Sequence, residues 1–386
     1  MTELERKALL PAGLRDILPP EAAFEAGIRE ALAASFAGHG YDRVKPPLVE
    51  FEDGLMSGAG AAVSGDTFRL MDPVSQRMMG VRADMTTQVA RIALTRLGDA
   101  PRPLRLSYTG EVLRVRGTQL RPEREFAQVG AELIGAESAA ADIEIISIAV
   151  ESLHALGIAD LSVDLTIPQL VPALLGSVDL DEDRLAALRE ALDHKDISAV
   201  RALGGAASDI LCRLMDGTGP GSEALPVLGD LDLPAAAARE LDRLRIVHDG
   251  LAKRIPALEI TVDPVENRGL EYHTGVAFTF FTRGERGEVG AGGRYIASLN
   301  GETGGEAATG FTLYVDTILR VLPDPERRPR VYVPAGTSNA EAVRLRDDGW
   351  VTVAGLDPAG DERAEAERLG CSHIWQDGRV AETGQR

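Results

Sequence analysis

Two glycine-rich segments carry the residues best suited to binding a small charged molecule. The first runs from Arg268 to Gly275 and includes Tyr272 and His273, and the second runs from Gly292 to Tyr295. Arginine supplies a cation for an anionic ligand, and glycine lets the backbone approach that ligand closely. The pattern predicts a pocket for a small anionic ligand. An Arg-Gly pair is also common in a turn with a solvated side chain, and these segments alone leave that alternative open.

Length and charge limit the classes of protein to which the chain can belong. With 386 residues, 44% of them hydrophobic and 26% charged, it is predicted to fold as one large domain with an appendage or as two domains. The formal net charge of −19 works against wrapping a polyphosphate backbone, which requires clustered cations. The basic stretch from Arg102 to Arg124 is a local exception.

Cysteine usage and the N-terminus indicate a cytoplasmic protein. Cys212 and Cys371 are too few for a disulfide framework or a cysteine-rich metal site, and we predict no metal and no cofactor. The first six residues lack the order of a secretion signal. No apolar run approaches the roughly 20 residues that a membrane span needs. We therefore expect neither export nor membrane insertion.

Hydrophobic spacing in the first half predicts helices and strands in a mixed order. We expect a helix that opens at Pro19-Pro20-Glu21 and ends at Gly38–Gly40, and a strand from Tyr41 to Glu50 that Pro46-Pro47 confines to an edge or a subunit boundary. Further expected elements are short strands between 68 and 81, helices capped by Asp84 and Ser138, strands 104–108, 125–134 and 161–166, and a mobile charged loop at 114–124.

The second half predicts a helical insertion and a separate C-terminal unit. Helical spacing from about 176 to 255 indicates the insertion, after which we expect strands at 258–263 and 276–281 and a helix from 313 or 314 to 322. The prolines of 323–329 indicate a linker. Residues 330–386 alternate strand and helix, which is typical of a small α/β unit.

Five parts of the chain resemble, in the same order, the motifs of a known family. They are Gly13–Pro19, Gly40–Glu50, Val81–Thr86, the pair Tyr108–Arg114 and Phe126–Glu132, and the two glycine-rich segments described above. They are similar to the opening segment, motif 1, the Arg-Pro-Glu-Gly-Thr segment, motif 2 and the histidine-specific pair of class II histidyl-tRNA synthetases. The resemblance spans roughly Leu10 to Leu322. It is strongest to the non-catalytic paralogues of these enzymes, the regulatory subunits of ATP phosphoribosyltransferase.

This resemblance implies a fold and a set of histidine-binding residues. The fold is α+β, with a class II aminoacyl-tRNA synthetase-like antiparallel sheet flanked by helices and a homodimer formed through the motif-1-like region. By position, the ammonium group of histidine would meet Asp84, Thr86 and Gln128, its ring would meet Glu132, its carboxylate would meet Arg114 and Arg268, and Tyr272, His273 and Tyr295 would line the ring pocket.

Two of these positions depart from the family, and several have ordinary structural alternatives. Asp84 replaces a glutamate, which shortens its reach, and His273 stands where a second tyrosine is usual. Asp84 could be a helix cap, Thr86 a first-turn residue and Glu132 an exposed strand residue.

The groups expected for adenylation are missing. Arg116 stands where motif 2 of the enzyme has a glutamate, and Thr317 stands where motif 3 has an arginine. Loss of one such electrostatic contact commonly costs 10²-fold or more in rate, on the order of 3 kcal/mol. We therefore expect no aminoacylation.

The resemblance therefore implies a regulatory subunit that partners a short catalytic subunit of ATP phosphoribosyltransferase, with histidine as effector, in the first step of histidine biosynthesis. The alternatives are a divergent histidine–tRNA ligase and a stand-alone histidine-sensing pseudo-synthetase. Residues 330–386 are too few and too acidic for a complete anticodon-binding domain. We expect the basic loop 114–124 to be a solvated loop or a partner contact, and nucleic-acid binding to be absent.

Overall fold

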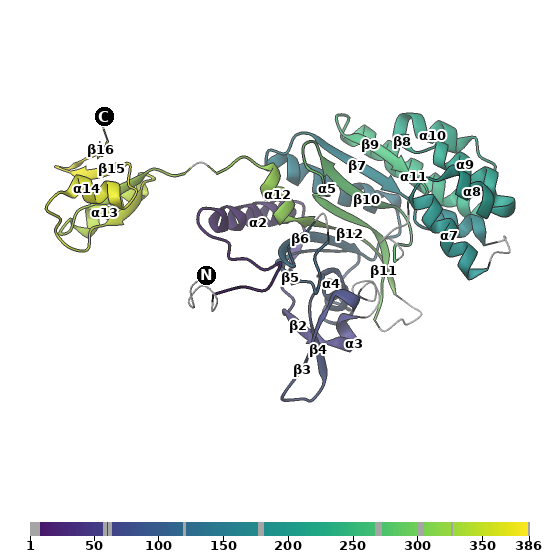
Figure 1. Cartoon of the computed structure of the whole chain (residues 1–386), viewed down its shortest axis with the longest axis horizontal. Helices are drawn as coiled ribbons and strands as arrows, with labels where there is room; N and C mark the ends of the chain where they lie inside the picture. The colour runs from purple at the N-terminus through teal and green to yellow at the C-terminus, as the bar shows by residue number, and fades with distance from the viewer. Residues whose placement is uncertain are drawn as a thin grey trace. The chain divides into compact units, whose positions relative to one another are not determined.

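The chain forms two compact units, Met1–Pro323 and Asp324–Arg386 (Figure 1). The computed structural model describes residues 8–56, 60, 64–118, 121–176, 181–266, 272–299, 305–325 and 327–384. No helix within these ranges is both long and apolar enough to cross a membrane.

A mixed sheet forms the centre of the first unit. In the described residues it has nine strands, in the order β1 (Asp42–Arg43), β5 (Leu104–Leu113), β6 (Glu125–Ile134), β12 (Glu306–Tyr314), β11 (Gly290–Ala297), β10 (Ala277–Thr282), β7 (Leu161–Thr166), β9 (Glu259–Asp263) and β8 (Gly219–Pro220). The β1–β5 and β7–β9 pairs are parallel, and the other described pairs of this sheet are antiparallel.

Helices cover both faces of this sheet because its strands are apolar on both sides. On one face, α2 (Glu21–Gly38) and α5 (Ala139–Ala155) pack over the odd-numbered residues of β6, and Phe36 meets Phe311 edge to face at 5.4 Å between ring centroids. On the other face, α4 (Thr86–Thr95) packs over Leu106 and Tyr108 of β5. The even-numbered residues of β6, which include Gln128 and Glu132, therefore face α4.

A small sheet projects from the first unit. It consists of β2 (Val49–Phe51), β4 (Met78–Val81) and β3 (Phe68–Met71), in that order (Figure 1). The short helix α3 (Glu52–Leu55) covers one side, where Leu55 packs against Gly80. The predicted strand from Tyr41 to Glu50 is thus split into β1 and β2, since the prolines between them donate no backbone hydrogen bonds.

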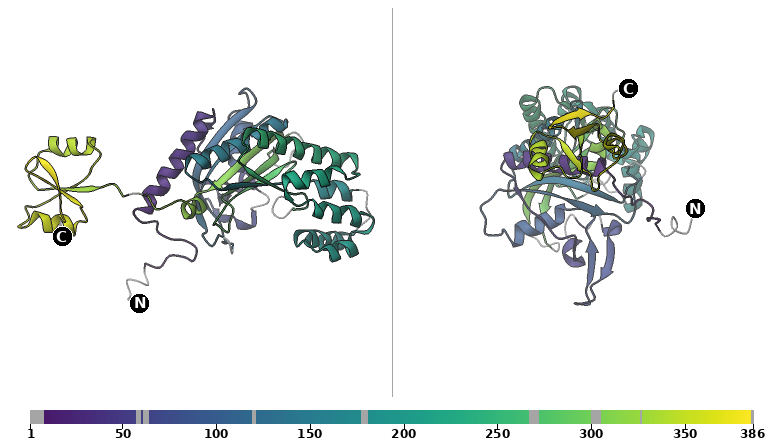
Figure 2. Two further views of the ribbon diagram at one scale, coloured as in Figure 1. Left: turned by 90° about the horizontal axis from the view of Figure 1, so that it is seen from above. Right: turned by 90° about the vertical axis from the view of Figure 1, so that its left-hand side faces the viewer.

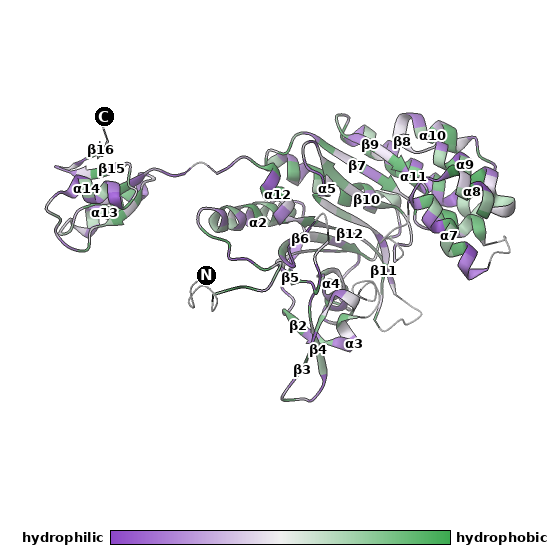
Figure 3. Cartoon of the chain, in the orientation of Figure 1, coloured by the Kyte–Doolittle hydropathy of each residue, from purple (hydrophilic) through white to green (hydrophobic). Residues whose placement is uncertain are grey.

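The predicted helical insertion is a stack of helices at one end of the first unit (Figure 2, left). After α6 (Leu170–Leu175) come α7 (Glu182–Asp193), α8 (Ile197–Leu203), the 3₁₀ turn η2 (Gly205–Ala207), α9 (Ser208–Asp216), α10 (Gly221–Gly229) and α11 (Ala235–Arg254). Hydrophilic and hydrophobic residues mix along these helices, as amphipathic packing requires (Figure 3). The short strand β8 was not predicted.

The second unit has its own four-stranded sheet in the described residues, in the order β14 (Val351–Ala354), β13 (Arg330–Val333), β15 (His373–Gln376) and β16 (Arg379–Glu382). The helices α13 (Asn339–Asp347) and α14 (Glu362–Arg368) follow Ser338 and Asp361, whose side chains accept hydrogen bonds from backbone amides of the first turn. The hairpin of β15 and β16 was not predicted.

Three local features differ from the expectations. The segments that form β11 and β12 were not predicted as strands, because their glycines weaken the strand pattern; here a Cβ on Gly292 would lie 2.1 Å from the carbonyl oxygen of Gly310. The following helix, α12 (Val315–Val321), begins after Tyr314, which belongs to β12. Asp84 lies one residue before the N-cap position of α4, which Met85 holds, and its carboxylate still caps the first turn by accepting from the Thr86 amide.

The capping box of α13 gives a test of the stability of the second unit. Ser338→Ala removes the hydroxyl that accepts from the Glu341 amide, and it should lower the free energy of unfolding of this unit by about 1 kcal/mol. The two tryptophans of the chain, Trp350 and Trp375, both belong to this unit, so tryptophan fluorescence during urea unfolding reports it. The neighbouring Asn339→Ala is the control, and equal midpoints for the two variants would contradict the prediction.

Candidate functional site

The start of α4 is fastened to β6 by Asp84 and Gln128. The carboxylate of Asp84 accepts from the Thr86 amide at 2.8 Å and from Nε2 of Gln128 at 2.9 Å. Gln128 is fully buried, and its Oε1 accepts from the Met85 amide at 3.2 Å. Asp84 therefore has a structural role, as one of the alternatives predicted, and its two oxygens still have capacity to accept further hydrogen bonds.

Glu132 lies four residues after Gln128 on the same face of β6 and is almost fully buried. It accepts from the Tyr295 hydroxyl at 3.0 Å and from the Tyr108 hydroxyl at 3.4 Å. Burial raises its pKa to about 8, against the hydrogen bond from Tyr295, while the charge of Asp84 adds to the increase and hydrogen bonds from Thr86 and Tyr108 oppose it. Near neutral pH this carboxyl group therefore exists in both protonation states. The alternative of an exposed strand position is wrong.

Glycines beside Glu132 make room for its carboxyl group. Gly310 lies opposite Glu132 in the β6–β12 register, and Gly293 lies opposite Gly310 on β11. A Cβ on Gly310 would lie 1.8 Å from Oε2 of Glu132, and a Cβ on Gly130 would lie 2.4 Å from the Tyr108 hydroxyl. Gly310 and Gly293 therefore leave this part of the sheet face, beside Glu132, without Cβ atoms. We call the row Glu132, Gly310 and Gly293 the Glu132 floor.

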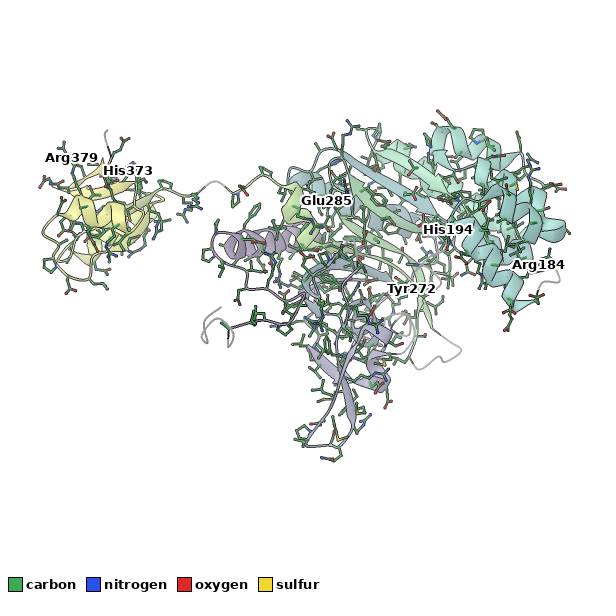
Figure 4. All side chains as sticks on the ribbon, viewed as in Figure 1. Arg184, His194, Tyr272, Glu285, His373 and Arg379 are labelled. Atoms are coloured by element: carbon green, nitrogen blue, oxygen red, sulfur yellow. The ribbon has the colours of Figure 1, made fainter. Side chains whose placement is uncertain are left out.

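Tyr272 and His273 lie at the far end of this floor. Their ring centroids are 3.9 Å apart, and a Cβ on Gly293 would approach the buried His273 ring to 2.5 Å. Desolvation of its hydroxyl group and the nearby charges of Asp84 and Glu132 raise the pKa of Tyr272. The Tyr272 side chain, labelled in Figure 4, is 36% exposed and forms the open side of the group.

The predicted cations have different positions. Arg114 is half-buried, donates to the carbonyl of Ala83 at 3.4 Å and lies 5.2 Å from the centroid of the Phe126 ring, which places it beside Asp84. Arg268 lies outside the described residues. Arg294, the second arginine of the glycine-rich segments, points to the opposite face of the sheet, where it pairs with Asp142 at 2.8 Å. Its guanidinium group therefore lies away from the candidate site.

Arg121 occupies the inner side of the basic loop. Its side chain is buried over the Tyr314 ring at 3.8 Å, and it pairs with Asp316 at 3.0 Å and donates to Thr317 at 3.3 Å. Thr317 is fully buried and also accepts from Arg320 at 3.2 Å. Arg116, by contrast, is exposed. The prediction of a solvated loop is therefore wrong for Arg121, because Asp316 and Thr317 already bind its guanidinium group.

The described ranges contain no group of three histidine, cysteine or acidic side chains placed to hold a metal ion. A hollow of about 280 Å³ lies between α7 and α8, lined by Ala187, Glu190, Ala191, His194, Asp196 and Ala199. Within it the Nδ1 atom of His194 already bonds the carbonyl of Glu190 at 2.8 Å, and none of the predicted site residues lines it.

Comparisons with known proteins agree with this arrangement. The family described as Histidyl-tRNA synthetase matches residues 13–318. An ATP phosphoribosyltransferase regulatory subunit of Paramagnetospirillum magneticum is 56% identical over 373 residues, which are 97% of both chains. Another, of Rhodospirillum centenum, is 53% identical over 98% of this chain and 97% of its own. The chain belongs to the family of ATP phosphoribosyltransferase regulatory subunits, with their histidyl-tRNA synthetase-like domain.

Solved structures confirm the fold. A crystal structure described as an ATP phosphoribosyltransferase regulatory subunit/histidyl-tRNA synthetase from Bacillus halodurans has a TM-score of 0.79 at 24% identity, over 93% of this chain and 96% of its own. The histidyl-tRNA synthetase of Nostoc sp. PCC 7120 has a TM-score of 0.77 at 17% identity, over 95% of this chain and 90% of its own. The predicted synthetase-like fold, with helices on both sides of the sheet, is therefore correct.

Within this family fold, the structure brings together eight of the nine predicted site residues, all except Arg268. The arrangement offers carboxylate and amide acceptors at one end and a buried carboxyl group with aromatic side chains at the other. Such a site suits a small zwitterion with a polar ring. Sequence reasoning did not assign Tyr108, Thr312, Gly310 or Gln169, whose Nε2 donates to the His273 carbonyl at 2.7 Å. The Tyr108 hydroxyl, which lies 2.7 Å from the Thr312 hydroxyl, belongs to a quoted motif, whereas the other three carried no signal.

The raised pKa of Glu132 predicts an unusual dependence of stability on pH. A carboxyl group whose pKa rises from 4.5 to about 8 on folding binds more protons in the folded state between these values, so the free energy of unfolding falls as pH increases. The slope is up to about 1.4 kcal/mol per pH unit.

Urea unfolding at pH 5.5, 6.5 and 7.5 measures this effect as the difference between the native chain and Glu132→Gln. The variant should lack this contribution, whereas Glu125→Gln, at the exposed start of the same strand, should retain it. Parallel pH profiles for the native chain and Glu132→Gln would rule out a buried titrating Glu132.

Proposed function

We propose that this chain is a non-catalytic regulatory subunit of ATP phosphoribosyltransferase that acts in the cytoplasm, activates a short catalytic subunit and conveys histidine feedback in the first step of histidine biosynthesis. Support comes from the two near-full-length relatives that carry this name. It also comes from the contrast between the acceptors around Glu132 and Arg121, whose charge is already paired with Asp316. The partner would perform the phosphoribosyl transfer.

The observation that carries the non-catalytic part of the proposal is the pairing of Arg121. A nucleotide triphosphate needs free cations, because its charge increases toward the transition state of adenylation. Here Arg121 is already neutralised by Asp316, and the position of the motif-3 arginine holds the buried hydroxyl of Thr317. To bind phosphate, Arg121 would have to break an ion pair between two buried groups, and such a break costs several kcal/mol, about 3–5.

The proposed ligand is free histidine, recognised by groups at both ends of the Glu132 floor. Its ammonium group would bind the oxygens of Asp84 and Gln128, and its carboxylate would bind Arg114 and Arg268. Its imidazole ring would meet Glu132, which accepts from a ring N–H when ionised and donates to a bare ring nitrogen when protonated. Thr86, Tyr272, His273 and Tyr295 would complete the surroundings of the ligand.

Histidine can regulate the partner only through a difference in affinity. If histidine binds the inhibited form of the complex more tightly than the active form, a coupling of about 1–3 kcal/mol changes the balance 5- to 150-fold. A site that makes no covalent change to its ligand is suited to this role, since its whole binding free energy is available to select between the two forms.

Reconstitution tests the proposed function directly. The purified chain is added to a weakly active short catalytic subunit, and phosphoribosyl transfer is followed with and without histidine. We expect stimulation that saturates with added chain and is reversed by histidine. Failure to stimulate at any ratio, or histidine-dependent ATP–pyrophosphate exchange by the chain alone, would contradict the proposal. The second result would instead support a divergent histidine–tRNA ligase.

Glu132 should dominate recognition of the imidazole ring. At pH 8.5, above the pKa of about 8 that burial gives Glu132, Glu132→Gln keeps the shape of the side chain but removes the negative charge. Because hydrogen bonds to charged groups contribute about 1.5–3 kcal/mol, histidine affinity at this pH should fall at least about tenfold. Isothermal titration calorimetry of the full chain measures the affinity. Glu125→Gln, on the same strand but exposed, should leave it unchanged; equal affinities for both variants would exclude Glu132 as the ring contact.

We further propose a homodimer through the region that resembles motif 1. The register of the small sheet places six apolar side chains on one face: Val49, Phe51, Phe68, Leu70, Met79 and Val81. None of the six is buried, whereas on the opposite face Leu55 of α3 covers the backbone at Gly80. A contiguous apolar face of this kind, directly after the predicted boundary prolines, indicates contact with a second copy.

Adjacent residues of β3 provide a matched test of this dimer. Leu70 points to the apolar face and is 39% exposed, and Met71 points to the opposite face and is 59% exposed. Leu70→Glu would bury a charge in the interface and should produce monomers in sedimentation velocity, whereas Met71→Glu should remain dimeric. A native chain that sediments as a monomer, or a dimeric Leu70→Glu, would refute this interface.

A further inference from the structure

Two residues link the insertion and its entry to the segment that carries Tyr272 and His273. Gln169 stands directly before α6, where the chain leaves the sheet toward the insertion, and its Nε2 donates to the His273 carbonyl at 2.7 Å. Arg243, midway along the last helix of the insertion, α11, reaches the same segment by way of Asp142 and Arg294. The entry to the insertion and its last helix are therefore both connected to one short stretch of the site.

Arg294 connects this stretch to the core. Its backbone amide donates to Val276 at 2.9 Å, and its carbonyl accepts from Thr274 at 2.8 Å, so it fixes the residues directly after His273. Its side chain packs against the backbone at Gly275, where a Cβ would lie 3.0 Å from its Cδ. The guanidinium group then crosses to the other face of the sheet and binds Asp142.

Asp142 joins Arg294 to the insertion. Its carboxylate is fully buried in the first turn of α5 and also pairs with Arg243 of α11 at 3.1 Å. Arg243 is partly exposed and donates in addition to the carbonyl of Glu137. Two guanidinium groups therefore share one buried carboxylate, and a shift of either group changes the hydrogen bonds that the carboxylate offers to the other.

We propose that Asp142 couples the position of α11 to the occupancy of the histidine site, so that ligand binding between Glu132 and His273 is transmitted to the insertion. This inference rests on the proposed histidine binding. Linkage requires the reverse effect as well: any partner that holds α11 in one position changes histidine affinity by the same factor. A partner that contacts the exposed side of the insertion would then respond to whether histidine occupies the site.

Hydrogen exchange of the full chain, with and without saturating histidine, tests the coupling. In the native chain, histidine should slow exchange of the β6 and β11 amides and also of α11, the latter at least about fivefold, the lower end of typical couplings. Arg243→Met removes the bond to Asp142 and should abolish the α11 response while β6 and β11 still respond. Arg245→Met is the matched control, because Arg245 is exposed on the same helix and pairs with Asp242.

The outcomes separate this inference from the proposed function. If calorimetry detects no histidine binding to the native chain, both fall. If histidine binds and slows β6 and β11 but leaves α11 unchanged, the coupling alone is refuted. Equal α11 responses in Arg243→Met and Arg245→Met would exclude Asp142 as the link. Should Arg243→Met fail to fold, Arg243→Gln answers the same question, since it keeps a polar side chain but loses the charge that pairs with Asp142. A full α11 response in this variant would overturn the proposal.

Discussion

The site depends on one buried carboxyl group, that of Glu132. A carboxyl group in the middle of a sheet face is tolerated only if donors reach it, and here two phenols on separate strands, Tyr108 and Tyr295, do so. The same group requires glycine at position 310, because any side chain there would overlap its oxygens. Each of the strands β5, β6, β11 and β12 therefore contributes a residue that the carboxyl group of Glu132 requires or, for β6, Glu132 itself.

Much of this arrangement could be predicted from the sequence, since it follows from local pattern. Gln128 and Glu132 are four residues apart on a strand, which places both on one face, and the turn with Asp84 and Thr86 precedes a helix that must cover a face. What could not be predicted depends on contacts between distant segments. Nothing near Thr312 or Gly310 indicates that they adjoin Tyr108 and Glu132, because the β5–β6–β12 register decides this.

Arginines were the least predictable residues. Arg294 follows two glycines in a segment whose pattern suggested an anionic ligand, yet strand alternation directs Tyr295 to the site and Arg294 to Asp142 on the other face. The basic loop shows the same effect, since Arg121 is paired inside the fold. In a chain with a net charge of −19, internal carboxylates compete for each cation, and an arginine in the sequence is therefore weak evidence for a ligand-binding cation.

The residues around Glu132 and those around Arg121 differ in how far their polar groups are already paired, and this difference bears on the proposed regulatory role. At one end, Glu132 titrates near neutral pH and retains hydrogen-bonding capacity, so it can still respond to a ligand. At the other end, Arg121 is bound by Asp316 and Thr317, and a phosphate would have to displace contacts already made. In the proposed regulatory role, the chain acts only through differences in binding free energy. Such differences must reach other elements through shared contacts, and the carboxylate of Asp142, bound by guanidinium groups from β11 and α11, is a contact of that kind.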